Sequence, residues 1–153
     1  MRVLFICLGN ICRSPTAEAI ARHMAGERGL ASRVTFDSAA IENYHPGKAP
    51  DRRSQRHARE RGYDLSALRA RVVTPRDFDE FDLILAMDES HMRRLRSSRP
   101  AGARAELALF LDSDSDLVGQ EVPDPYYGGE EGFEEVLDLC ERALESWFER
   151  WAD

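Results

Sequence analysis

Residues 2–15 read RVLFICLGNICRSP, and this stretch indicates the fold of the whole chain. Residues 2–7 are mostly apolar, as expected of a short buried strand, and the Gly-Asn pair that follows them is a turn signal. Ser14 and Pro15 predict the start of a helix, because serine is a good N-cap and proline is tolerated at the first helical position. The sequence therefore predicts a strand, a tight loop and a helix in direct succession.

Strands and helices alternate along the rest of the chain. Further strands are predicted at residues 34–38, 81–87 and 106–111. Helical segments are predicted at residues 14–28, 50–61, 74–78, 89–96 and 130–151. This alternation is typical of one α/β domain, residues 1–153, with a parallel sheet covered by helices on both faces. Ligands of such sheets bind beyond the carboxyl ends of the strands, where residues 8–13 are expected to lie.

Composition and charge exclude several classes of protein. The chain has 153 residues, of which 42% are hydrophobic and 32% charged, so it is neither a disordered chain nor a membrane protein. Its longest apolar run near the start, residues 3–8, is too short for a bilayer span or a signal peptide, and a cytoplasmic protein is expected. The net charge of −7 argues against nucleic acid and membrane lipid as partners.

The cysteines argue against both a disulfide framework and a zinc site. There are three of them, Cys7, Cys12 and Cys140, and an odd number in a cytoplasmic chain does not fit a set of disulfides. The spacing Cys-x4-Cys, without a second Cys/His pair, does not match zinc ligands. We therefore expect neither a metal nor a cofactor.

The loop after Cys7 has the features of an anion cradle. Five residues separate Cys7 from Arg13, and they are Leu8, Gly9, Asn10, Ile11 and Cys12. A loop of this length can turn its backbone N–H groups inward around a tetrahedral anion, and the helix that follows adds further donors. Arg13 supplies a planar fork for two phosphate oxygens. These positive surroundings are expected to favour the thiolate of Cys7, which suits phosphoryl transfer through a thiophosphate intermediate.

At these residues the chain resembles the low-molecular-weight protein tyrosine phosphatases. The family signature C-x-G-N-x-C-R-S-P stands here at residues 7–15, and a second motif, Asp-Pro-Tyr-Tyr, stands at residues 124–127. Three further segments, residues 37–40, 47–51 and 86–90, also resemble the family, so the resemblance covers essentially the whole chain. It implies a three-layer α/β sandwich with a four-stranded parallel sheet in the order 2-1-3-4, no metal, and a two-step mechanism.

The resemblance assigns chemical roles to three residues. It implies that Cys7 is the nucleophile and that Arg13 binds the phosphate. It implies that Asp124 is the general acid. On chemical grounds such a group is required, because the phenolate must be protonated as it leaves and a water must later be deprotonated.

The resemblance also implies roles for residues that support the loop. Ser14 matches a hydroxyl that stabilises the thiolate, while Asn10 and Ser38 match a polar network that keeps the loop in shape. Arg61 is expected to support the loop, with Glu18 as its partner. Asp88, in contrast, is interpreted only as a helix N-cap.

Aromatic residues are expected to select the substrate. The resemblance places Tyr44 on one rim of the cleft and Tyr126 and Tyr127 on the other, where they could stack on a phenyl ring. A deep, narrow pocket favours phosphotyrosine over the shorter phosphoserine. The expected partner is a tyrosine-phosphorylated protein, with inorganic phosphate as product and inhibitor.

Three alternative functions stay open at this point. Arginine phosphatases of the same fold carry threonine where this chain has Ile11, which cannot hydrogen-bond a guanidinium. Arsenate reductases of the fold need two further redox cysteines near residues 80–90, whereas Cys140 is predicted to lie in the core. A phosphopeptide-binding module without turnover would be expected to lack the nucleophile or the acid.

Cys12 has two possible roles that the sequence does not separate. It could act as a redox guard that closes a disulfide with oxidised Cys7 before irreversible over-oxidation. It could equally be a small residue packed under the loop.

Overall fold

The computed structural model describes residues 1–152 as a single α/β domain. Its four strands are β1 (Arg2–Cys7), β2 (Thr35–Ala40), β3 (Leu83–Ala86) and β4 (Glu106–Leu109). All neighbouring strands are parallel, and their order is β2-β1-β3-β4. The predicted fold class and strand order are therefore confirmed.

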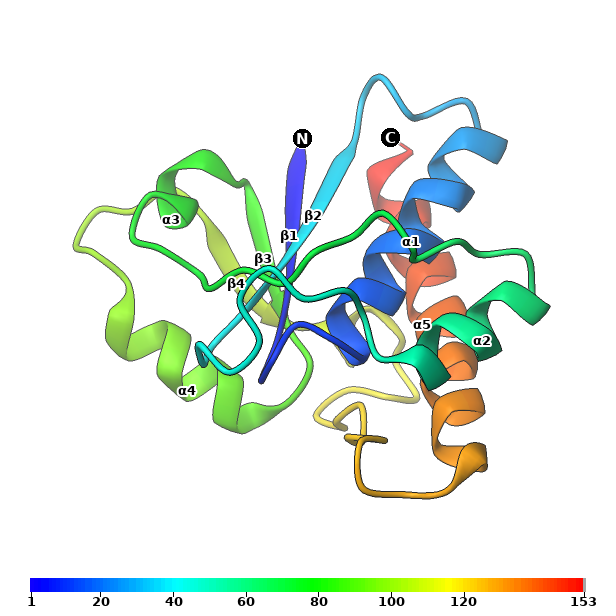
Figure 1. Cartoon of the computed structure of the whole chain (residues 1–153). Coiled ribbons are helices and arrows are strands. Elements are labelled where there is room, and N and C mark those ends of the chain that lie inside the picture. Colours follow the sequence, from blue (N-terminus) through cyan, green and yellow to red (C-terminus); the bar gives the residue numbers. More distant parts are fainter. Residues whose placement is uncertain (153) are drawn as a thin grey trace.

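Helices cover both faces of the sheet. They are α1 (Arg13–Glu27), α2 (Arg52–Glu60), α3 (Asp77–Glu80), α4 (Glu89–Ser98) and α5 (Glu130–Trp151). Figure 1 shows α1, α2 and α5 on one side of the sheet and α3 and α4 on the other. Val3 and Phe5 of β1 point into the first of these layers, and Leu4 and Ile6 point into the second. A strand buried on both faces has no polar side, which is why β1 is a continuous apolar run.

The helical segment expected at residues 74–78 is displaced to α3, Asp77–Glu80, and two further local expectations are wrong. The strand predicted at residues 106–111 ends at Leu109, and a single 3₁₀ turn, η1 (Phe110–Ser113), follows it. Phe110 and Leu111 are buried in that turn, so the apolar pattern continues beyond the strand. Ser14 is not the N-cap of α1, because Cys12 holds that position and the Ser14 side chain points elsewhere.

The strand ends determine where a ligand site can form. β1 ends at Cys7, which pairs in register with Ala40 at the end of β2, and the next strand, β3, ends at Ala86. The loops that follow these ends lie at one edge of the sheet, below the strands in Figure 1. Within residues 1–152, no helix is both long enough and apolar enough to cross a membrane.

Candidate active site

The loop between β1 and α1 is fixed by hydrogen bonds that its carbonyl groups accept from outside it. The Cys7 carbonyl accepts from the Ile41 amide at 3.0 Å, and the Leu8 carbonyl accepts from the Glu42 amide at 3.0 Å. The Ile11 carbonyl accepts from the Asp51 amide at 2.8 Å. Asn10 has a φ of 58°, in the left-handed region, and its Oδ1 accepts from the Arg71 amide at 3.1 Å. Asparagine tolerates this conformation better than most residues.

The amide groups of the same loop, in contrast, have no such partners among residues 1–152. In the described part of the chain, the N–H groups of residues 9–12 donate to no protein acceptor. The pocket above them is lined by Cys7, Leu8, Gly9, Ile11, Cys12, Arg13, Tyr44, His45, Asp124, Tyr126 and Tyr127. Successive free amides at a helix N-terminus form a binding site for an anion.

A chain of hydrogen bonds surrounds the sulfur of Cys7. The Ser14 Oγ lies 3.0 Å from Cys7 Sγ, and the Ser14 amide donates to the same sulfur at 3.5 Å. Asn10 uses both of its amide hydrogens, one to Ser14 Oγ at 2.8 Å and one to Ser38 Oγ at 2.9 Å. Because Ser14 accepts from Asn10, its own proton is free to point at the sulfur, an arrangement that suits a thiolate.

The network ends at a buried carboxylate. Ser38 Oγ donates to Glu18 Oε1 at 2.7 Å, and Glu18 also pairs with Arg22 at 2.6 Å. Burial raises the pKa of Glu18, although the bonds from Ser38 and Arg22 oppose this effect. The structure thus brings Asn10, Ser14 and Ser38 together as the resemblance implies.

The expected pairing of Arg61 with Glu18 is wrong. Arg61 lies against α5, where its guanidinium pairs with Glu134 at 2.7 Å, Asp138 at 2.9 Å and Glu141 at 2.6 Å. It makes no ion pair with Glu18, which is satisfied by a residue of its own helix. Arg61 follows the last residue of α2, and its side chain reaches α5 rather than the loop between β1 and α1.

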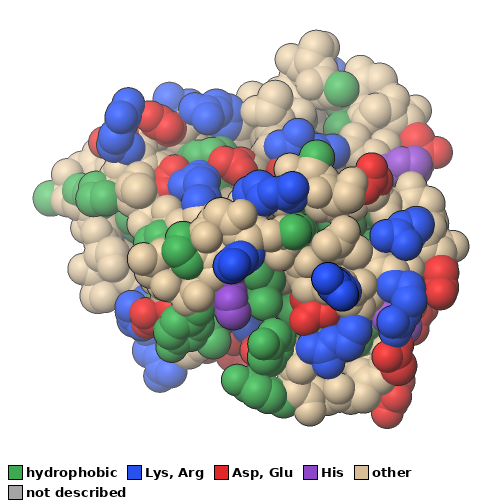
Figure 2. All heavy atoms as spheres, viewed as in Figure 1, with side chains coloured by type: hydrophobic (Ala, Val, Ile, Leu, Met, Phe, Trp, Pro, Cys, Tyr) green, Lys and Arg blue, Asp and Glu red, His purple; other side chains and the backbone are tan. Residues whose placement is uncertain are grey.

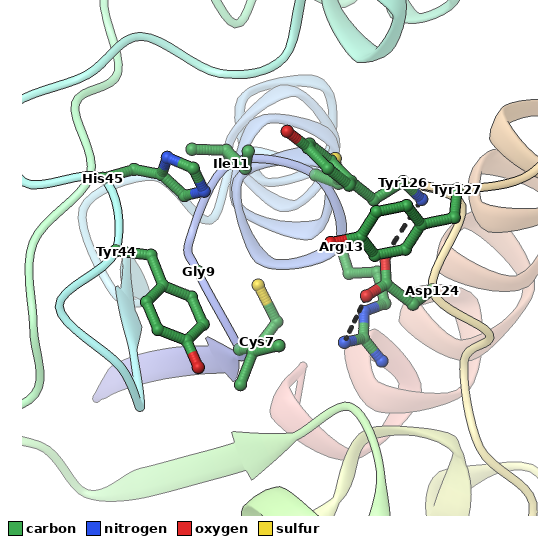
Figure 3. Close-up of a pocket in the computed structure, with 11 residues that line it drawn as sticks. Cys7, Gly9, Ile11, Arg13, Tyr44, His45, Asp124, Tyr126 and Tyr127 are labelled. Carbon is green, nitrogen blue, oxygen red and sulfur yellow. Dashed lines mark hydrogen bonds and ion pairs between the residues drawn. The ribbon is translucent and has the colours of Figure 1, made fainter.

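Arg13 is buried and held from two sides. Its Nη1 donates to Asp88 Oδ2 and to the Val122 carbonyl, both at 3.0 Å. Its Nη2 lies 3.7 Å from Asp124 Oδ2, as the dashed line in Figure 3 shows. A guanidinium fixed in this way faces the pocket in one orientation.

Asp88 has a second role that the N-cap interpretation missed. Its Oδ1 accepts from the His91 amide at 3.0 Å, which caps α4, while its Oδ2 holds Arg13. Burial opposes its charge, yet the bonds from Ser90, His91 and Arg13 keep the pKa of Asp88 below its usual range. A usable signal was present, because an acid that follows a central parallel strand lies at the ligand edge of the sheet.

Asp124 stands in the loop that connects η1 to α5. Its Oδ1 accepts from the Tyr126 amide at 3.0 Å, which forms a turn over Pro125. Its side chain is 39% exposed, so the carboxyl group remains open to the pocket and to water. Figure 3 shows Asp124 and Tyr44 on opposite sides of the pocket, with Cys7 between them.

Four aromatic rings form the mouth of the pocket. Tyr126 and Tyr127 meet edge to face with centroids 4.8 Å apart, and Tyr44 and Tyr127 are 62% and 92% exposed. His45, which sequence reasoning missed, lies between Tyr44 and Ile11 in Figure 3, and a Cβ on Gly9 would come within 3.0 Å of its ring. In Figure 2, apolar side chains gather near the lower centre of this face, with Lys and Arg side chains around them.

The other two cysteines are buried thiols. Burial raises the pKa of Cys12 to about 12, although a hydrogen bond with Ser54 opposes the effect. Cys140 is a residue of α5 and is fully buried in the core, as predicted. No cysteine in the described residues is part of a disulfide.

Comparison with known proteins now identifies the family. The family model described as "Low molecular weight phosphotyrosine protein phosphatase" matches residues 2–152. The chain belongs to this family. Among its curated members, a low molecular weight protein-tyrosine-phosphatase of Bacillus subtilis is 44% identical, and the match covers 94% of each chain. The chain is therefore an enzyme of the low molecular weight phosphatase family.

Solved structures agree with this assignment. A protein tyrosine phosphatase from Entamoeba histolytica superimposes with a TM-score of 0.91 at 38% identity, covering 97% of this chain and 94% of that one. A Drosophila arginine phosphatase superimposes equally well, with a TM-score of 0.91 at 28% identity over 100% and 99% of the two chains. The fold alone therefore does not separate a phosphotyrosine substrate from a phosphoarginine one.

Proposed function

We propose that this phosphatase hydrolyses phosphotyrosine in proteins, and small aryl phosphates, through a cysteinyl-phosphate intermediate. One observation carries the proposal. The sulfur of Cys7 lies on the floor of a loop whose free amides and fixed Arg13 would hold three phosphoryl oxygens. A phosphoryl group held there would have its phosphorus in line with the sulfur, which supports attack by Cys7.

In the first step, Cys7 attacks and Asp124 protonates. The Cys7 thiolate forms the S–P bond while the bond from phosphorus to the aryl oxygen breaks. The carboxylic acid of Asp124 gives its proton to that oxygen, so the product leaves as a neutral phenol. Arg13 and the loop amides stabilise the negative charge on the equatorial oxygens of the transition state.

In the second step, water releases the phosphate. The Asp124 carboxylate takes a proton from a water molecule that attacks the phosphorus, and the S–P bond breaks. Ser14 donates its hydrogen bond to the departing thiolate, which lowers the barrier to its release. Inorganic phosphate is the product, and it is expected to inhibit by occupying the same cradle.

The walls of the pocket support an aromatic substrate. Tyr44 and His45 on one side and Tyr126 and Tyr127 on the other could enclose a phenyl ring. Ile11 offers no hydrogen bond to a guanidinium, which disfavours phosphoarginine. The tyrosine-phosphorylated partner and the cytoplasmic location both stay predictions.

The decisive experiment compares three phosphate ligands on the purified protein without added metal. We expect turnover of p-nitrophenyl phosphate and of a phosphotyrosine peptide, and much slower turnover of a phosphoarginine peptide. Faster release of phosphate from the phosphoarginine peptide would make the chain an arginine phosphatase. Phosphate binding without any turnover would indicate a phosphopeptide-binding module.

Asp124→Asn tests the general acid. The amide cannot supply a proton of suitable acidity, so kcat/KM for aryl phosphates with basic leaving groups should fall by ~10²-fold or more. Aryl phosphates with acidic leaving groups need no proton and should lose far less. Steady-state kinetics across a leaving-group series measures the difference, and equal losses along the series would remove Asp124 from this role.

We further propose that Cys12 is the redox guard of Cys7. Peroxide converts the Cys7 thiolate to a sulfenic acid, and attack by Cys12 then forms the disulfide and releases water. Because burial raises the pKa of Cys12 to about 12, little of this thiol is ionised at pH 7, and disulfide closure should become faster as the pH rises.

Cys12→Ser is the test of this guard. After brief peroxide treatment, the wild-type protein should show a mass loss of ~2 Da and recover fully with dithiothreitol, whereas Cys12→Ser should do neither. Equal recovery of both proteins, without the mass change, would show that Cys12 serves only in packing.

A further inference from the structure

Outside the pocket, a histidine joins the two helices that flank the loop of Asp124. His57 of α2 is only 8% exposed, and its ring stacks on Phe133 of α5 with centroids 5.6 Å apart and planes 9° apart. Its Nδ1 faces a carboxylate oxygen of Glu134, and its Nε2 faces one of Glu130. A neutral imidazole carries a single N–H, so bonds to both carboxylates require the doubly protonated imidazolium.

The surroundings of this imidazole are dense in charge. The groups around it are Glu60, Glu130, Glu134, Arg53, Arg56 and Arg61. Burial disfavours the imidazolium, but the hydrogen bonds to Glu130 and Glu134 outweigh it and raise the pKa of His57. In Figure 2, acidic side chains line the lower right edge of the molecule, beside Lys and Arg side chains.

The same helix also holds the middle of the loop. Arg53, one turn before His57, donates from Nη2 to the Tyr126 carbonyl at 3.0 Å. Its guanidinium lies 5.5 Å from the centre of the Tyr126 ring and 4.7 Å from that of Phe133. The loop of residues 124–129 is thus tied to α2 at Tyr126 and, where α5 begins, at Glu130.

We propose that His57 is a positioning residue. As an imidazolium that bridges Glu130 and Glu134, it fixes the loop of residues 124–129 over the phosphate cradle. The proposal rests on the function proposed above for Asp124. Loss of one ring proton removes one of the two N–H donors, so one carboxylate loses its bond. The start of α5, and with it Asp124 and the tyrosine wall, is then held less firmly.

The direction of the pH dependence follows from the raised pKa. When the pKa of a group is higher in the folded state, protonation of that group stabilises the fold. The stabilisation is complete at a pH below the pKa in the unfolded chain, which is ~6.5 for histidine. The stabilisation is lost as the pH rises through the folded value. The loop should therefore be firmest in mildly acidic solution and should loosen at alkaline pH.

A bound cation is the competing explanation of this cluster. His57, Glu60 and Glu134 each offer one possible ligand atom. These three atoms lie within 4.8 Å of one another, which is close enough to share an ion. However, both ring nitrogens already face carboxylates, and Arg56 and Arg61 already neutralise those carboxylates. This arrangement fits a protonated histidine better than a metal ligand.

His57→Gln tests the bridge, with His23→Gln as the matched control. Glutamine is neutral, and both of its N–H donors sit on one nitrogen, so it cannot replace the two separate ring donors of the imidazolium. His23 is an exposed residue of α1 that pairs with Glu27 at 2.9 Å. At pH 6, amide hydrogen exchange at residues 124–130, corrected for intrinsic rates, should be about tenfold faster in His57→Gln and unchanged in the control. His57→Arg, a planar cation that can serve both carboxylates, should retain slow exchange at pH 6 and at pH 8.5.

Kinetics supply a readout that simple destabilisation would not move. In His57→Gln, kcat/KM should fall about tenfold for aryl phosphates with basic leaving groups and little for those with acidic ones, because the displaced group is the acid. If His57→Gln does not fold, Glu130→Gln removes one half of the bridge at an exposed position.

Several outcomes would overturn the proposal. One is equal amide hydrogen exchange in His57→Gln and the control. Another is a neutral His57 ring at pH 6 by NMR. A third is amide exchange in the wild-type protein that becomes faster with a chelator and slow again with Zn²⁺. The last outcome would make the cluster a metal site. If the wild-type protein hydrolyses no aryl phosphate, the proposed function fails, yet the exchange and NMR measurements still decide the role of His57.

Discussion

Cys7→Ser is expected to abolish turnover while leaving the fold and phosphate binding in place. The serine hydroxyl at its ordinary acidity is a poor nucleophile without an adjacent base, and Ser14 offers only a hydrogen bond. Removal of a nucleophile costs several orders of magnitude, so we expect a loss in kcat of at least ~10⁴-fold. Hydrolysis of p-nitrophenyl phosphate by concentrated enzyme measures the residual rate.

Two controls make this result specific. Cys12→Ser is the same chemical change in the same loop, and it should retain activity within about tenfold because Cys12 is the N-cap of α1 and a protonated thiol. Phosphate should still raise the melting temperature of Cys7→Ser, which shows that the cradle persists. Activity of Cys7→Ser within tenfold of wild type would exclude Cys7 as the nucleophile.

Arg13→Lys is expected to lose ~10³-fold or more in kcat, although the positive charge is kept. The guanidinium bonds to Asp88 and the Val122 carbonyl through Nη1, which leaves the N–H groups on its Nε and Nη2 for phosphoryl oxygens. An ammonium group has no planar fork and cannot make both sets of bonds in one geometry. The loss should appear in kcat more than in KM, because the fork matches the planar transition state.

The matched substitution is Arg52→Lys, at an exposed position in the first turn of α2. It should leave kcat and KM close to the wild-type values. A near-normal kcat/KM in Arg13→Lys would show that this residue acts only as a general cation. If Asp88→Asn also lowers kcat, by less than Arg13→Lys does, the result would support the role of Asp88 in orienting the guanidinium.

The sheet and the loop between β1 and α1 could be predicted because their determinants are local. An apolar strand, a Gly-Asn turn and a helix start follow one another in residues 2–15, and each is recognisable without the rest of the chain. The end of β4 was misplaced because burial of Phe110 and Leu111 continues after the strand's hydrogen bonds stop. An apolar pattern reports burial, which strands and buried turns share.

The contacts across the site could not be predicted in the same way. Asp88 was expected only as a cap, since its bond to Arg13 joins residues 75 positions apart. Arg61 was assigned to the loop, but the orientation of α2 turns it toward α5. His45 gave no signal, because its position beside Gly9 depends on how the loop after β2 lies against the loop after β1.

The bond from Arg13 to the Val122 carbonyl spans 109 residues, and this span affects how the enzyme comes into being. β1 precedes the other three strands in the chain, yet it lies inside the sheet with β2 and β3 on either side of it. Contacts of such long sequence separation form late, because the intervening chain must first be ordered. In a nascent chain, Arg13 therefore cannot be held in this orientation until the segment around Val122 has been synthesised.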